Sequence, residues 1–201
     1  QLFNDDFVIS VGNTGMNCGG ITSTFDGRIW TAEEWFRSSN NAIVDRDKSD
    51  FVIGMGTVGD SANAGIAAAV GFPGFNGDTI AKYQNYNYMT EIDPRNAVAV
   101  RKQYNWGRQP FEGGCILPDN KTVYLGADAT PGCFTKFVAD VAGDFTVGTT
   151  YVYKHDAANK WIEIDNADLD KMLNFAAEAV AVGATMFNLL EWVAYYPADC
   201  N

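Results

Sequence analysis

Short apolar runs separated by turn-forming residues are the feature that most constrains this fold. The turn sequences FDGR, DPRN, PDNK and HDAAN recur at short intervals. Several runs alternate apolar and polar residues, as half-buried antiparallel strands do. The predicted strands are 7–11, 28–32, 86–92, 97–101, 114–117, 122–126, 133–138, 149–154 and 160–164. This pattern favours an all-β sandwich, barrel or propeller.

One convincing helix and one poorly patterned region interrupt the strands. Asn166 or Asp168 can cap the helix, and Gly183 ends it. The residues expected on its buried face are Leu169, Met172, Leu173, Ala176, Ala177 and Val180. Residues 40–80, rich in Gly, Ala, Ser and Asn, are expected to form a glycine-rich insertion or loop with a short helix.

Length and charge narrow the class of protein. A chain of 201 residues can bury one sizeable core, so we expect a single domain over 1–201. The net charge of −11 argues against nucleic acid as a partner and suits a protein that binds hard cations, although surplus acids also keep a secreted protein soluble. No apolar run approaches the roughly 20 residues of a membrane span. The start at Gln1, without methionine or signal peptide, suggests a processed or excised chain.

The four cysteines do not form a recognisable metal ribbon or redox motif. Cys18, Cys115, Cys133 and Cys200 include no C-x-x-C pair. One or two disulfides would suit an oxidising compartment. Cys115 and Cys133 would lie on strands that flank the 122–126 strand, which is too far apart for a relaxed bridge.

Common hydrolase and calcium-loop signatures are excluded by the residues. His155 is the only histidine, it lies in a turn, and no G-x-S-x-G elbow accompanies it. Asp45-x-Asp47-x-Ser49 resembles the start of a calcium loop, but Asp50 and Gly56 occupy the positions that need glycine and glutamate.

The sequence Gly54-Met-Gly56-Thr-Val-Gly59 has the G-x-G-x-x-G spacing of dinucleotide-binding loops. Such a loop needs a strand before it, a helix after it and alternating βαβ units. The downstream strands follow one another without crossover helices. A nucleotide-binding domain is therefore a remote alternative, and a glycine-rich surface loop is the favoured interpretation.

Acidic residues recur at the predicted strand ends, beside glycine or large aromatic residues. They are Asn4-Asp5-Asp6, Glu33-Glu34, Glu112, Asp128 and Glu191, joined by Cys18 in the small-residue turn NCGG. Carboxylates that converge from separate strands repel one another unless cations neutralise them. The pattern therefore suggests a metal site, the alternative being that the acids simply face water.

Several motifs in order carry a resemblance to a known family. They are NDDF, NCGG, TAEE, the segment from YNYMTEIDPRN through RQPFEGGCILPDNKTVYLGAD to CFTKFV, TTYVYKHDAANKWIEI and GATMFNLLEW. Together they resemble the secreted PhoX-type alkaline phosphatase family, a six-bladed β-propeller with iron and calcium ions at one end. At about 45 residues per blade, this chain would supply about four blades with one or two packed helices. Another polypeptide or further chain segment would then complete the propeller.

The resemblance implies roles for individual residues. Cys18 would bind iron as a thiolate, and Glu112 and Glu191 match metal-binding glutamates. The residues that match calcium-binding or bridging acids are Glu33, Glu34 and Asp128, with Asn4, Asp5 and Asp6 as a further N-terminal segment. The implied cofactors are Ca²⁺ and Fe³⁺, the implied reaction is metal-assisted hydrolysis of a phosphate monoester, and the implied location is secreted, periplasmic or cell-surface.

The chain departs from the family motifs at positions that bear on activity. The alanine that follows the motif cysteine is missing, Ala32 stands in place of a cysteine, and Phe111 in place of a histidine. Leu189 replaces the arginine of R-P-E-W, which would hold phosphate through two hydrogen bonds. The alternative function is thus a catalytically impaired, metal-stabilised extracellular binding or structural protein.

Overall fold

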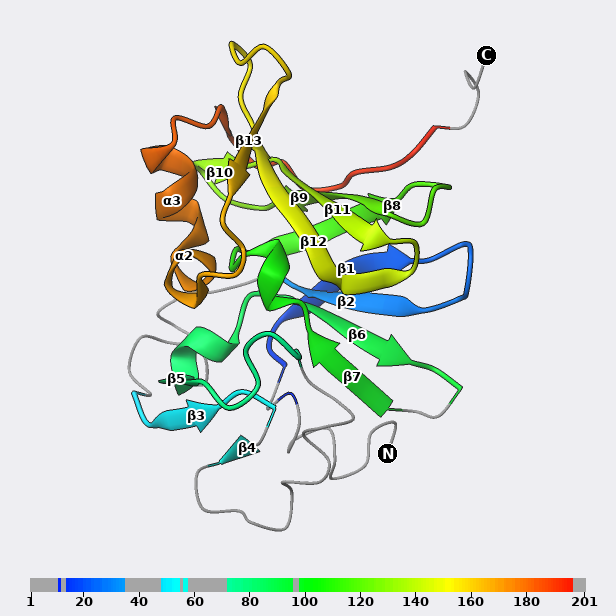
Figure 1. Ribbon diagram of the computed structural model, residues 1–201, viewed down its shortest axis with the longest axis vertical. Helices are drawn as coiled ribbons and strands as arrows, with labels where there is room; N and C mark the ends of the chain where they lie inside the picture. The colour runs from blue at the N-terminus through cyan, green and yellow to red at the C-terminus, as the bar shows by residue number, and fades with distance from the viewer. Residues whose placement is uncertain are drawn as a thin grey trace.

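The computed structural model describes residues 11, 14–34, 48–54, 56–57, 72–95 and 98–196. These residues fold mainly into antiparallel strands (Figure 1). The strands are β1 (Asn17–Thr22), β2 (Ile29–Glu33), β3 (Asp50–Val52), β4 (Gly56–Thr57), β5 (Thr79–Ala81), β6 (Met89–Asp93), β7 (Val98–Lys102), β8 (Phe111–Ile116), β9 (Thr122–Ala127), β10 (Gly132–Cys133), β11 (Thr135–Val141), β12 (Asp144–Tyr153), β13 (Trp161–Ile164) and β14 (Met186–Phe187). The described helices are η2 (Lys82–Asn85), η3 (Tyr104–Trp106), α2 (Leu169–Leu173) and α3 (Phe175–Ala181).

Two sheets of blade size dominate the architecture. One has four strands in the order β1-β2-β6-β7, and the other has five in the order β13-β12-β11-β9-β8. Strand β1 of the first sheet packs beside β8 of the second (Figure 1). Two smaller sheets, β4-β3-β5 and β10-β14, complete the described strands. The predicted all-β, propeller-like class is confirmed, with two blade-sized sheets and two small ones in place of four equal blades.

An aromatic core joins the two large sheets. Trp30 on β2 meets the edge of Phe145 on β12, with ring centroids 5.5 Å apart. Trp106 on η3 lies 5.9 Å from Phe137 on β11. These rings and Phe111 on β8 are buried. Because large rings from both sheets interlock, the ends of β1, β2, β8 and β9 are held in fixed relative positions.

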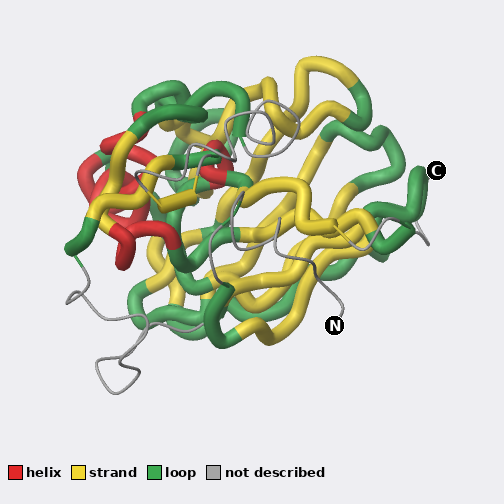
Figure 2. The backbone as a smooth tube through the Cα atoms, turned by 90° about the horizontal axis from the view of Figure 1, so that it is seen from below, coloured by secondary structure: helices red, strands yellow, loops and turns green. Residues whose placement is uncertain are grey.

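The helical region differs from the single predicted helix. The Asp168 carboxylate caps α2 by accepting a hydrogen bond from Lys171 N, but α2 ends at Leu173, and Asn174 separates it from α3. The break changes which residues face the core: Phe175 is buried, whereas Val180 is 57% exposed. Figure 2 shows both helices gathered at one end of the molecule.

The NCGG segment is a strand rather than the predicted small-residue turn. It forms the first four of the six residues of β1, which pairs with β2 through a register irregularity between Asn17 and Gly20. Glycine often indicates a turn, but in this strand it allows close approach of two backbones. A Cβ atom at Gly19 would collide with the Glu112 carbonyl oxygen.

The described part of the GMGTVG segment, Gly54, Gly56 and Thr57, lies in a β-hairpin. Gly54 lies in the turn of a hairpin with a φ of +75°, and Gly56 opens β4, pairing with Val52 on β3. Gly59 lies outside the described residues. A dinucleotide loop passes from its strand directly to a helix N-terminus, so the hairpin position of Gly54 and Gly56 argues against the nucleotide-binding alternative.

Of the remaining predictions, most of the strands are confirmed, one disulfide possibility is wrong, and several segments lie outside the described residues. The predicted strands from 86 to 164 match β6 to β13 within a few residues at most ends, with 133–138 divided into β10 and β11. The 7–11 strand, most of the 40–80 insertion and Cys200 lie largely or wholly outside the described residues. Cys18, Cys115 and Cys133 are free thiols, so a disulfide among these three is ruled out. In the described part of the chain, no helix has the length and apolar character to cross a membrane.

Candidate metal centre

Three elements bring a thiol and two carboxylates together at one edge of the large sheets. Cys18 lies on β1, Glu34 directly follows β2, and Glu112 lies on β8. Pairing of Asn17 with Glu33 places Cys18 near the end of β2, and Glu34 N donates to Met16 O at 3.3 Å. One ligand atom from each of the three residues lies within 4.8 Å of the other two.

This donor set fits a metal ion. Two ligands of one Ca²⁺ ion each lie about 2.3–2.6 Å from it, so their atoms can be up to about 5 Å apart. Carboxylate oxygens suit Ca²⁺, and a thiolate suits a transition metal such as iron. The three ligand atoms therefore have both the chemistry and the spacing of a metal site.

Without a metal, the Cys18 thiol keeps its proton. A hydrogen bond to Glu34, partial burial, and the charges of Glu34 and Glu112 raise the pKa of Cys18 to about 11. The Cys18 Sγ also donates to Glu112 Oε1 at 3.6 Å. A cation that binds here would have to displace this proton, as metal thiolates require.

Glu112 is the carboxylate of the cluster whose surroundings most favour binding of a cation. Its Oε2 atom is buried and has no hydrogen-bond partner. Burial raises the pKa of Glu112, and the negative charges of Glu191, Glu34 and Asp128 raise it further, against the hydrogen bond from Cys18. A buried carboxylate oxygen facing other acids is stabilised by a bound cation.

Asp128 and Glu191 extend the acidic cluster. Asp128 follows β9, and its backbone N donates to Pro110 O at 2.8 Å, which ties it to the entry of β8. Its Oδ1 atom is also buried without a partner. Glu191 belongs to the segment after β14, and its charge acts on Glu112. Asp128 and Glu191 thus add two carboxylates to the surroundings of Cys18, Glu34 and Glu112.

Glu33 is not brought into this cluster. Its side chain is fully buried, and Oε1 lies 2.9 Å from Lys102 Nζ on β7. Its carboxylate also accepts from Gly15 N at 3.2 Å and Tyr88 N at 3.0 Å. Burial raises the pKa of Glu33 and lowers that of Lys102, and each charge opposes the shift of the other. The described partners of the Glu33 carboxylate are thus an ammonium group and two backbone N–H groups, and its metal role stays a prediction.

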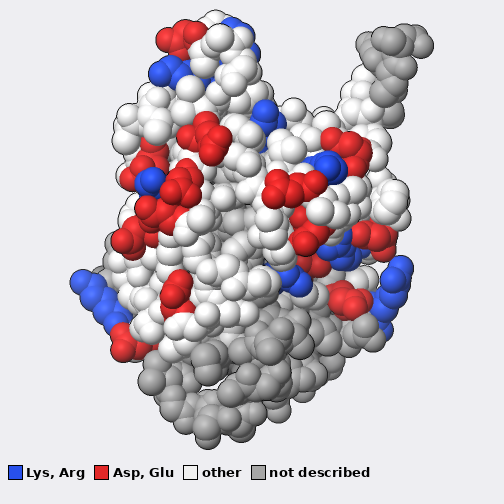
Figure 3. Space-filling model, in the orientation of Figure 1, with Lys and Arg blue, Asp and Glu red and all other residues white. Residues whose placement is uncertain are grey.

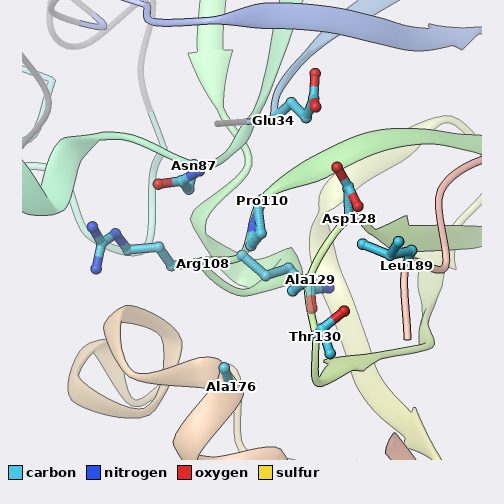
Figure 4. A pocket seen from close by; sticks show the side chains of 10 residues that line it. Glu34, Asn87, Arg108, Pro110, Asp128, Ala129, Thr130, Ala176 and Leu189 are labelled. Carbon is cyan, nitrogen blue, oxygen red and sulfur yellow. The ribbon is translucent and has the colours of Figure 1, made fainter. Parts of the chain in front are cut away.

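A cavity of about 470 Å³ adjoins the acidic cluster. It is lined by Glu34, Asn87, Arg108, Gln109, Pro110, Asp128, Ala129, Thr130, Ala176 and Leu189 (Figure 4). The Asp128 carboxylate lies on the same side of the cavity as Glu34, and the Arg108 side chain extends in the opposite direction. The cavity therefore connects the acidic cluster with Asn87, Arg108 and Gln109, here called the polar wall.

The polar wall is held by hydrogen bonds within the protein. Arg108 Nε donates to Tyr86 O at 3.0 Å, and its second nitrogen donates to Tyr83 O at 3.2 Å. Gln109 Nε2 donates to Thr135 Oγ1 at 2.7 Å. These bonds fix the shape of the cavity and hold the Arg108 guanidinium toward the backbone of η2 and its C-terminal end.

Sequence reasoning missed Lys102, Asn87 and Arg108. Lys102 directly follows the predicted strand 97–101, where a lysine normally reaches solvent. Asn87 has a φ of +73°, and its side chain donates to Glu33 O at 3.3 Å. Arg108 stands four residues before Glu112 in the same motif, and this proximity was the one available signal.

The structure also locates the substituted and excluded residues. Phe111 is buried in the core rather than near the ligands. Leu189 is 57% exposed and lines the cavity next to Asp128. His155 occupies a turn between β12 and β13, as predicted. Asn4, Asp5 and Asp6 lie outside the described residues, so their metal role stays a prediction.

The fold and the site define a class: an all-β, propeller-like protein with a thiol-carboxylate cluster beside a cavity. The sequence matches the family described as alkaline phosphatase PhoX over residues 2–200, and the chain therefore belongs to the PhoX family.

Comparison with solved structures gives the same fold. The chain is similar to Pseudomonas fluorescens PhoX, solved in complex with vanadate, a transition state analogue, with a TM-score of 0.62 and 21% sequence identity. The match covers 93% of this chain but 38% of that one, so this chain corresponds to well under half of that protein. A search of curated proteins found no match.

Proposed function

We propose that this chain carries a metal site of a phosphomonoesterase that acts outside the cytoplasm, with Ca²⁺ and Fe³⁺ as its metals. The observation that carries the proposal is the meeting of Cys18, Glu34 and Glu112 beside a cavity of about 470 Å³. Buried, unpartnered oxygens on Glu112 and Asp128 support it. Family membership supplies the expected reaction.

The residues around the cavity suggest separate roles in metal and phosphate binding. Cys18, Glu34 and Glu112 would hold the metals, with Asp128 and Glu191 as additional carboxylates. A bound cation would polarise a phosphoryl oxygen and stabilise the negative charge that develops on it. Asp128 and Glu34 belong to the acidic cluster and also line the cavity. A phosphate in the cavity would therefore be adjacent to the proposed metal ligands.

A second function is favoured by one specific observation. Leu189, in place of the family arginine, puts an apolar side chain on the cavity wall, and the described arginine of that wall, Arg108, donates to backbone carbonyls. Loss of one preorganised donor to a transition state can cost about 10²–10³ in kcat. The alternative is a metal-stabilised extracellular binding or structural protein without turnover.

Elemental analysis for Ca and Fe, together with hydrolysis of p-nitrophenyl phosphate, separates the two functions. The phosphatase proposal expects bound metal and turnover that a chelator abolishes. Metal without turnover would favour the alternative, and Leu189→Arg should then raise hydrolysis if the lost arginine is the cause. Absence of both metals under loading conditions would refute the site itself.

The proposed location rests on the same family membership. A secreted, periplasmic or cell-surface protein meets millimolar Ca²⁺ more readily than a cytoplasmic one, and weak extracellular calcium modules bind at about 10⁻⁴–10⁻³ M. Fractionation of the producing cells, followed by detection of the chain, would test this part of the proposal.

A further inference from the structure

The segment after β14 lies directly on the metal-binding edge of the sheets. Residues 188–192, here called the C-terminal strap, follow Met186–Phe187 of β14, which pairs with Gly132–Cys133 of β10. Leu189 N then donates to Ala129 O at 3.0 Å. The strap is therefore attached to the chain just beyond Asp128 before it reaches Glu191.

Three glycines on three strands leave room for the strap. A Cβ atom at Gly113 on β8 would lie 2.8 Å from Cε3 of Trp192, and one at Gly19 on β1 would collide with the same indole ring. A Cβ atom at Gly126 on β9 would collide with the carbonyl oxygens of Leu190 and Glu191. Any side chain at these positions would push the strap away from the sheets.

The glycine positions are adjacent to the ligands. Gly19 follows Cys18, Gly113 follows Glu112, and Gly126 lies two residues before Asp128. The indole of Trp192 thus presses on the backbone beside two ligands, one residue after Glu191. Tyr195, farther along, lines a separate cavity with Gly114 and Cys115, so the chain continues along β8.

We propose that Trp192 is a positioning residue that holds Glu191 over the Cys18–Glu34–Glu112 cluster by seating its indole on Gly19 and Gly113. The inference rests on the metal site proposed above and adds the means by which the C-terminal strap contributes to it. Geometry supports the placement: the Glu191 carbonyl oxygen lies against Gly126, two residues before Asp128, and the Trp192 ring lies against Gly113, which follows Glu112.

Exposure separates this role from an ordinary core contact. Trp192 is 61% exposed although its ring contacts two glycines. An exposed ring contributes less to folding than a buried one such as Trp30, which is 2% exposed. Its removal should therefore affect metal affinity more than the stability of the fold.

Calorimetric titration with Ca²⁺ alone tests the inference on the full chain. Trp192→Ala should weaken Ca²⁺ binding about tenfold or more, the range measured when residues that orient metal ligands are lost. Trp192→Phe should restore most of the affinity, because a flat ring can occupy the same seat. The urea midpoint of the metal-free protein should be nearly unchanged in both variants.

Gly126→Ala provides an independent test that leaves Trp192 in place. Its new methyl group would displace the Glu191 backbone and should also weaken Ca²⁺ binding. The matched control is Gly27→Ala, at a turn glycine with open space around its would-be Cβ; because its φ is +75° it should lower stability somewhat but leave Ca²⁺ affinity unchanged.

The outcomes distinguish this inference from the proposed function. Wild-type affinity in Trp192→Ala would overturn the inference alone. Failure of the wild-type chain to bind Ca²⁺ would overturn it together with the metal site. Absence of phosphatase turnover, with Ca²⁺ affinity lowered in Trp192→Ala, would leave the inference standing and reject the catalytic proposal.

Discussion

Glu33 and Glu34 are neighbours in the sequence but meet opposite environments. Glu33 points into the core, where Lys102 lies 2.9 Å away and Gly15 and Tyr88 donate backbone hydrogen bonds. Glu34 lies at the edge, beside the Cys18 thiol and Glu112. Consecutive strand residues face opposite sides, so a single step along the chain exchanges an internal cation for an open cluster of acids.

The two glutamates thus differ in whether a cationic side chain of the protein neutralises their charge. The buried pair supplies its own counter-charge and contributes to the fold. The open cluster has no ammonium or guanidinium among its closest described members, and it leaves oxygens of Glu112 and Asp128 without partners. On the face seen in Figure 3, acidic and basic side chains are interspersed. Mutations in the Glu33–Lys102 pair and in the Cys18–Glu34–Glu112 cluster should therefore have different effects.

The largest expected effect comes from breaking the buried pair. Lys102→Met should lower the free energy of unfolding by about 3–5 kcal/mol, because it leaves Glu33 buried and unpaired. Urea denaturation measures the change. The matched control is Lys171→Met, whose exposed ion pairs with Asp165 and Asp168 at 3.7 Å should contribute less than about 1 kcal/mol. Equal effects in both variants would contradict the contrast.

The next effect concerns metal binding to the open cluster. Ca²⁺ at 100 times its dissociation constant should stabilise the wild-type chain by about 2.7 kcal/mol. Glu112→Gln should remove most of this gain, because a neutral amide is a poorer ligand than a carboxylate. Thermal unfolding with and without Ca²⁺ measures it. An unchanged gain in Glu112→Gln would show that the ion binds elsewhere.

A smaller effect appears in the pH dependence of the metal-free protein. The pKa of Glu112 is raised by burial and by Glu191, Glu34 and Asp128. Its contribution to stability is therefore fully present below the unfolded pKa, near about 4.3, and is lost as the pH rises through the folded pKa.

Glu112→Gln should abolish that loss. In chelator, the variant should match the wild type near pH 4 and exceed its free energy of unfolding at pH 7, by about 1 kcal/mol or less for so open a site. Denaturation at the two pH values gives the comparison. A wild type that gains stability relative to the variant on going to pH 7 would contradict the raised pKa.

The smallest effect is on one thiol. A pKa raised from 9.0 to about 11 lowers the thiolate fraction at pH 8 by two powers of ten, or about 100-fold. Exposed Cys18 should thus alkylate slowly with iodoacetamide, and Glu34→Gln should speed the reaction several-fold. Peptide mapping identifies the labelled residue. Rapid labelling of Cys18 in the wild type would argue against its hydrogen bonds to the two acids.

The strands could be predicted from alternation, and the core strands from 86 to 164 lie close to their predicted positions. The spacing predicts one continuous helix, whereas Asn174 divides it into α2 and α3. Local spacing does not show where such a break falls. NCGG was misjudged because glycine marks both turns and strands that lie close to another backbone. Only the tertiary structure separates these two uses.

The pattern of strand-end acids suggests a metal site, and the family resemblance supplies the role of each residue. Strand-end acids are common, and nothing local distinguishes Glu33 from Glu34. The difference depends on Lys102, which is 69 residues from Glu33 in sequence and reaches it because β2 and β7 both flank β6. A sequence pattern cannot show that pairing. The metal roles of Cys18, Glu34, Glu112, Asp128 and Glu191 stay predictions.

A Ca²⁺ titration of two variants tests the central claim most directly. One is Glu34→Gln, and the other is Glu33→Gln combined with Lys102→Met, which removes both buried charges together. Circular dichroism confirms that each is folded. The account predicts a loss of affinity of about tenfold or more in Glu34→Gln and wild-type affinity in the double variant. Equal losses in both, or a loss confined to the double variant, would contradict it.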